Sequence, residues 1–117
     1  MANPNRGEVE VDLGDQTYKT RLNLDGIVRI ENDLNMSIVQ AAQRLSEGAM
    51  PVNQIVVIIH RALKGGGNKV EQKDVQKIIW DAGLADAMKV VGLILTSVLG
   101  VDAEDDDEGK DLGTGSE

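Results

Sequence analysis

The chain offers few side chains for catalysis. Its only histidine, His60, could move protons near neutral pH, but the sequence suggests no nucleophile to pair with it. On a helical wheel His60 lies with Val57 and Lys64, away from the apolar stripe of its segment, so we expect a surface side chain. One histidine cannot build a multi-histidine metal site, and the absence of cysteine excludes disulfides, thiol catalysis and zinc–thiolate sites. We therefore expect no enzyme, no metal and no cofactor.

A glycine run at 65–67, followed by Asn68 and Lys69, could be compared with a phosphate-binding loop. The run lacks the G-x-x-x-x-G-K-[ST] spacing, and it follows a predicted helix rather than a strand. We interpret it as a flexible linker between two helices.

Acidic residues near the C-terminus could ligate calcium. The stretch 104–109 begins in the manner of an EF-hand loop, but Gly115 stands where the closing glutamate belongs. The loop also lacks predicted helices on both sides. We interpret the segment as a solvated acidic tail.

Nearly all of the net charge of −8 lies in that tail. Residues 102–117 carry eight Asp or Glu and one Lys, whereas residues 1–101 carry twelve Asp or Glu and eleven Lys or Arg. We predict one folded domain over 1–101 and a disordered tail over 102–117, because the tail has too little apolar content to offset its ordering entropy. An acidic chain of this kind is not expected to bind nucleic acid.

No membrane interaction is expected either. Residues 1–7 lack the apolar core of a secretory signal. The longest uncharged run, 90–101, is too short to cross a bilayer.

Residues 8–22 alternate between apolar and charged side chains on both sides of Gly14 and Asp15, which predicts a tight β-hairpin. A two-residue turn pairs the mostly apolar face as Leu13–Gln16, Val11–Tyr18 and Val9–Thr20. On the other face it pairs Asp12–Thr17, Glu10–Lys19 and Glu8–Arg21. Two of these last three pairs join opposite charges, which favours the register. The apolar face should therefore lie on another part of the fold.

Five helices are predicted after the hairpin, over 24–34, 37–47, 51–64, 71–82 and 84–99. Asn23 can cap the first, and Ser37 with Gln40 forms a capping box for the second. Pro51 suits the first turn of the third, which favours a helix although the β-branched run 55–59 alone could be a strand. The predicted fold class is thus mainly α (α+β), with five helices and an N-terminal hairpin.

The predicted helix at 84–99 is apolar on all sides. Its inner stripe is assigned to Leu84, Met88, Val91, Leu95, Val98 and Leu99. Val90, Leu93 and Ile94 then form a second apolar surface, which is either central in the fold or buried against another chain. We take these three residues as candidate partner contacts.

Trp80 is the fourth candidate contact. On the helix at 71–82 it lies about 140° from Val75, among Lys73, Gln76 and Lys77. Aromatic residues concentrate in binding hot spots, so it could anchor a partner. The simpler alternative is that another helix or Tyr18 covers it.

Several segments together resemble a known family. They are Ala2-Asn3-Pro4-x-Arg6-Gly7-Glu8-Val9, Tyr18-x-x-Arg21-Leu22, Ile30-Glu31, His60-Arg61-Ala62-Leu63 with Gly65-Gly66-Gly67, and Asp81-Ala82-Gly83-Leu84. Their order, over about residues 2–99, resembles the small tail protein encoded by gene transfer agents and siphophage-like prophages. That family is labelled both a tail tube protein and a tail assembly chaperone.

The resemblance implies a non-enzymatic role in virion assembly. A tail assembly chaperone coats the long, helical tape measure protein until tube subunits polymerise around it. Such a protein would act in the cytoplasm of a bacterial host, with the tape measure protein, the tail tube protein or copies of itself as partners. The alternative is a structural component of the virion tail. Known tail tubes are chiefly β-sheet assemblies, and one predicted hairpin weighs slightly against that alternative.

Overall fold

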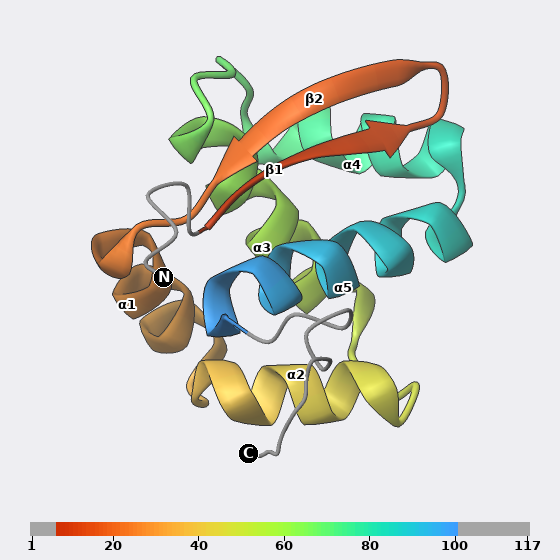
Figure 1. Ribbon diagram of the computed structural model, residues 1–117. Helices are drawn as coiled ribbons and strands as arrows, with labels where there is room; N and C mark the ends of the chain where they lie inside the picture. The colour runs from red at the N-terminus through yellow and green to blue at the C-terminus, as the bar shows by residue number, and fades with distance from the viewer. Residues whose placement is uncertain (1–6, 101–117) are drawn as a thin grey trace, which may run out of the picture.

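The computed structural model describes residues 7–100, and the predicted acidic tail at 102–117, with its calcium interpretation, lies outside the described residues. Within 7–100 the chain forms a two-stranded hairpin followed by five α-helices, which confirms the predicted fold class (Figure 1). The elements are β1 Glu8–Leu13, β2 Gln16–Arg21, α1 Leu24–Leu34, α2 Ile38–Ser46, α3 Val52–Gly65, α4 Gln72–Ala82 and α5 Leu84–Leu99.

The hairpin has the predicted register. Leu13 pairs with Gln16, and the charged face pairs Glu8 with Arg21, whose side chains lie 3.7 Å apart. Gly14 takes a φ of 65°, which supports the two-residue turn. Val11 and Leu13 are buried, so the apolar face packs on the body as expected.

Local side-chain caps define the helix starts, as the sequence predicts. The Asn23 side chain accepts a hydrogen bond of 2.9 Å from the Gly26 N–H at the start of α1. Ser37 and Gln40 form the predicted capping box of α2. Glu31 adds a contact that was not predicted: its carboxylate accepts a 2.9 Å hydrogen bond from the Ile38 N–H and so joins the end of α1 to the start of α2.

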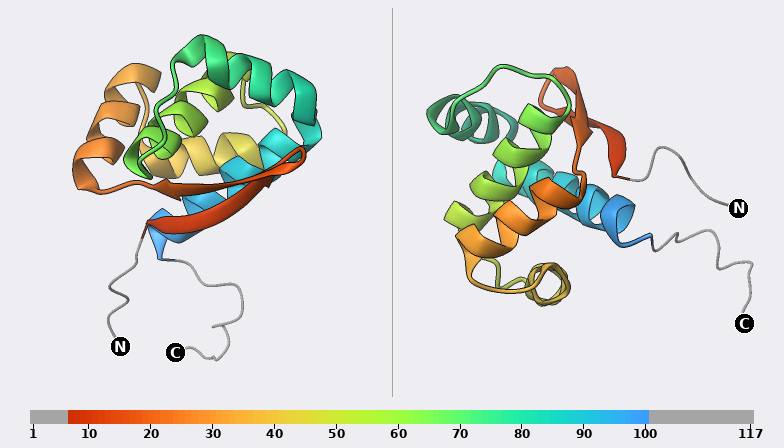
Figure 2. Two further views of the ribbon diagram at one scale, coloured as in Figure 1. Left: turned by 90° about the horizontal axis from the view of Figure 1, so that it is seen from above. Right: turned by 90° about the vertical axis from the view of Figure 1, so that its left-hand side faces the viewer.

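Helices α3 and α5 supply most of the core. The hairpin lies across both, with β2 against α3 and β1 against α5, while α2 packs on another side of α5 (Figures 1 and 2). The buried residues of α3 are Ile55, Val56, Ile58, Ile59, Ala62 and Leu63. Those of α5 are Ala87, Val90, Val91, Ile94, Leu95 and Val98. Helix α5 is therefore a central element with neighbours on several sides.

The glycine run begins the connection between α3 and α4, as interpreted, but its first two residues also pack closely against β2. Gly65 is the last residue of α3 and Gly66 caps the helix, and both lie directly against the carbonyl groups of β2. A Cβ at either position would come closer than 3.0 Å to a β2 backbone oxygen. The Asn68 amide then donates to the carbonyls of Lys19 at 2.8 Å and Leu63 at 2.9 Å. Gly65 and Gly66 thus form a close-packing contact between a helix end and a strand, whereas a Cβ at Gly67 would meet nothing within 4 Å.

His60 is half-buried rather than a plain surface residue. Its Nε2 lies 3.1 Å from the carbonyl oxygen of Val70, to which the imidazole donates when Nε2 carries the proton. The side chain thereby ties α3 to the segment that precedes α4. Its role in this structure is a packing and hydrogen-bonding one.

Candidate partner-binding surface

The bend between α4 and α5 carries an exposed group of apolar side chains. The chain bends by 117° between α4 and α5, and Gly83 forms the junction with a φ of 99°. Trp80 lies on the last turn of α4, Leu84 begins α5, and Met88 follows one turn later. We call Trp80, Leu84 and Met88 the elbow residues. Trp80 is 81% exposed, and the other two are each about two-fifths exposed.

Trp80 faces solvent because α4 is anchored by other residues. Val75 and Ile79, four positions apart, turn one side of the helix into the core. Trp80 shares the exposed side with Lys73, Gln76 and Lys77, as the wheel predicts. Neither Tyr18 nor another helix covers it, so the simpler alternative for Trp80 is wrong.

Burial of the exposed indole by a partner would contribute a sizeable hydrophobic free energy to binding. An aromatic side chain of this kind buries roughly 150–250 Å² when a partner covers it. At about 25 cal/mol per Å², this corresponds to roughly 4–6 kcal/mol before the entropy of association is subtracted. A contribution of that size is typical of a binding hot spot.

Val90 and Ile94 do not form the predicted second surface. They are 2% and 1% exposed, because the hairpin, α2, α3 and α4 all pack around α5. Neither side chain is accessible to a partner in this fold, and both are corrected to core residues. The predicted inner stripe is confirmed for Val91, Leu95 and Val98, which are buried. It is wrong for Leu84 and Met88, which are exposed.

Leu93 remains a candidate contact but stands apart from the elbow residues. It is 49% exposed. Nine residues separate it from Leu84, which places it about half a turn around the axis of α5. Of the four predicted contacts, the structure therefore leaves two accessible, Trp80 on α4 and Leu93 on α5.

Polar chemistry at the elbow is sparse. The nearest ion pair joins Lys77 to Asp81 at 3.2 Å, on the solvent side of α4. Within residues 7–100, no three His, Asp or Glu side chains are placed to hold a metal ion. Over the same range no single helix has the length and hydropathy of a membrane span; α4 and α5 reach both only when taken together, across their bend.

Comparison with known proteins gives one family. A family model described as phage tail tube protein, GTA-gp10, matches residues 6–101. No curated protein matches the chain, and no solved structure does.

Proposed function

The chain belongs to the phage tail tube protein, GTA-gp10 family, and from that premise we propose that it is a tail assembly chaperone that binds apolar helices of a tape measure protein. Family membership makes it a phage tail-related protein. The chaperone activity is the further step that we propose. In this proposal the chaperone binds its partner in the cytoplasm of a bacterial host and catalyses no reaction.

The exposed Trp80 is the observation that carries this proposal. The side chain is 81% exposed on the last turn of α4, and tryptophan is among the residues enriched in binding hot spots. A flat indole suits the apolar face of a helix, which offers grooves between successive turns. Leu84 and Met88, on the first two turns of α5, add further exposed apolar area. Methionine adapts to irregular surfaces, which suits a partner that presents many non-identical segments.

Binding to the neighbouring tape measure protein tests the proposal directly. Trp80→Ala should weaken the complex by roughly thirtyfold, since a hot-spot truncation costs about 2 kcal/mol and each 1.4 kcal/mol is tenfold. Leu24→Ala is the matched control, because Leu24 is also an exposed apolar residue but lies on α1. Unchanged binding after both Trp80→Ala and Leu93→Ala would remove both accessible candidate contacts and the proposed mode of binding.

A tube subunit is the second candidate, because the family's own description names a tail tube protein. The edges of the hairpin weigh against it. The register turns the outer backbone groups of β1 away from β2 at Glu8, Glu10 and Asp12, whose acidic side chains border that edge. The outer edge of β2 is covered by Gly65, Gly66 and Asn68.

Mass spectrometry of purified particles separates the two candidates. A chaperone leaves the tail before completion and should be absent or present in traces. A tube subunit should be among the most abundant proteins of the particle. Abundant recovery would overturn the chaperone proposal and place the protein in the virion tail.

A further inference from the structure

A cationic pocket lies on the side of the fold where β2 leads into α1. It has a volume of about 220 Å³ and is bordered by the end of β2, the start of α1 and the end of α3. Four basic side chains line it, together with a single carboxylate, that of Asp25. They are Arg21, Arg29, Arg61 and Lys64. Four of the eleven basic residues in 1–101 are thus gathered at one place.

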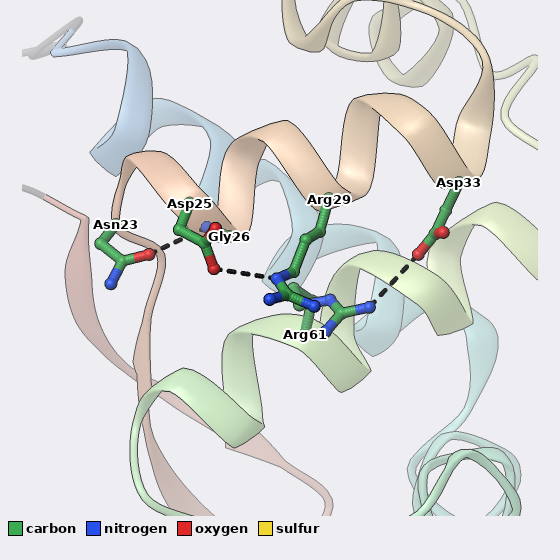
Figure 3. A network of polar contacts seen from close by, with 6 residues as sticks. All are labelled: Asn23, Asp25, Gly26, Arg29, Asp33 and Arg61. Carbon is green, nitrogen blue, oxygen red and sulfur yellow. Dashed lines mark hydrogen bonds and ion pairs between the residues drawn. The ribbon is translucent and has the colours of Figure 1, made fainter.

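The carboxylates around the pocket leave several N–H donors of these basic side chains without a hydrogen-bond partner. Arg29 donates from Nε to Asp25 at 2.8 Å, and this bond together with the charge of Asp25 raises the pKa of Arg29 (Figure 3). Arg61 reaches Asp33 through Nη2 at a long 3.4 Å, while its Nε is buried without a hydrogen-bond partner. A guanidinium carries five N–H donors, and an unpaired buried one is rare in a folded protein.

Lys64 adds a charge that is not neutralised locally. It is exposed at the end of α3 and forms no ion pair with any residue in 7–100. Arg21 lies 3.7 Å from Glu8, at the outer limit of an ion pair. The pocket is therefore suited to a ligand that brings several carboxylates at once, because planar guanidinium groups bind carboxylates through paired N–H donors.

We propose that the pocket binds the chain's own acidic segment, residues 102–108, within the same molecule. That segment holds six Asp or Glu in seven residues and no basic residue. It follows directly after α5, whose C-terminal end lies at the end of the molecule that α1 also occupies (Figures 1 and 2). The complementarity of charge and the position of α5 both support this occupant. The inference is independent of the proposed chaperone function.

The distance to be covered is within reach. An extended chain advances about 3.3–3.6 Å per residue, so residues 101–108 can extend about 26–29 Å from Gly100. The folded body measures 43 × 26 × 25 Å. The acidic segment can thus cross either short dimension without having to run along the long one. Because most of the groups are exposed, the contact should weaken strongly as salt screens it.

Zero-length carbodiimide cross-linking of the full chain tests the contact. Lys64 should couple to Asp or Glu of 102–108 at least tenfold more than Lys73 or Lys77, which are exposed lysines on α4. The preference should disappear in 1 M NaCl, where screening acts over only about 3 Å. Equal coupling of all three lysines at low salt would overturn the proposal.

Mixing isotope-labelled and unlabelled chains before cross-linking shows which molecule supplies the segment. Cross-links should join residues of the same isotope composition. If the Lys64 cross-links joined labelled to unlabelled chains, the acidic segment would come from a neighbouring copy, and the intramolecular proposal would be wrong.

Two double variants provide a second measurement that needs no cross-linking reagent. Arg21→Gln with Lys64→Gln removes two charges from the pocket, whereas Lys73→Gln with Lys77→Gln removes two from α4. Backbone amide NMR signals of 102–108 should shift in the first variant toward their positions in 1 M NaCl, and stay in place in the second. Signals of the helices report that each variant is folded. Tail signals that respond to neither the pocket variant nor salt would refute the contact.

Discussion

Replacing Gly66 by alanine should force α3 away from the hairpin. Gly66 has a φ of −82°, which any residue adopts, so alanine adds no backbone strain of its own. Its Cβ, however, would lie within 3.0 Å of the Lys19 carbonyl group and of the Thr20 Cα. Both are backbone atoms of β2, and they cannot rotate out of the way as a long side chain can. The strand or the helix end has to shift.

The size of the effect follows from two contributions. Overpacking a well-packed site costs about 1–3 kcal/mol. A shift of α3 also endangers the hydrogen bond from Asn68 to the Lys19 carbonyl, worth about 1 kcal/mol. We expect Gly66→Ala to lower the free energy of unfolding by about 3 kcal/mol, which corresponds to a fall in Tm of about 12–24 °C for a domain of this size.

Gly92→Ala is the matched control with the opposite expected sign. Gly92 lies inside α5, and an added Cβ would meet only Leu45 Cδ2 at 3.7 Å, an ordinary contact. Removing glycine from a helix interior stabilises by about 1 kcal/mol. The same chemical change should therefore destabilise at one position and stabilise at the other.

Urea unfolding followed by far-ultraviolet circular dichroism measures both variants. Tryptophan fluorescence is a poor probe here, because Trp80 is already exposed in the folded state. A Gly66→Ala variant within about 0.5 kcal/mol of the unchanged protein, at an equal m-value, would refute the close-packing account of the glycine run.

Three further outcomes follow from the placement of single side chains. Ile94→Ala should lower the free energy of unfolding by about 2–5 kcal/mol and Leu93→Ala by less than about 1 kcal/mol; equal losses in urea would contradict their assignment to core and surface. The fluorescence emission of Trp80 should resemble that of tryptophan in water and be quenched by acrylamide, whereas a blue-shifted, protected emission would mean that something covers it. Asn68→Ala and Asn68→Asp should both destabilise by about 1–3 kcal/mol in thermal unfolding, because each removes the amide donor to the Lys19 carbonyl; an unchanged Tm for Asn68→Asp would show that this donor contributes nothing.

The features that sequence reasoning predicts well are the local ones. The hairpin register follows from one continuous segment, since Glu8 meets Arg21 when the loop is centred between Gly14 and Asp15. The caps at Asn23 and Ser37 depend on atoms within three residues of each other. No distant part of the chain is needed to choose between the alternatives in these cases.

The features that it misses depend on distant neighbours. Helix α5 is apolar all round, so its own sequence does not say which side faces inward. The elements packed around it, β1, α2, α3 and α4, decide this, and Val90 is buried while Leu84 is exposed. The glycine run is correctly predicted as the connection between two helices, but its sequence does not predict the contact of Gly65 and Gly66 with β2. The exposure of Trp80 could be inferred from its position on the helical wheel, but only the packed structure shows that neither Tyr18 nor another helix packs over it.

The arrangement of α5 has a practical consequence for handling the protein. This helix rises about 24 Å over its length and runs from the bend beside Trp80 to the end of the described chain, near which β1 also begins. Both ends of the folded body thus point away from the tryptophan. A fluorophore attached close to Gly7 or Gly100 would therefore start at the opposite end of α5 from the indole, and labelling there should leave binding through Trp80 intact.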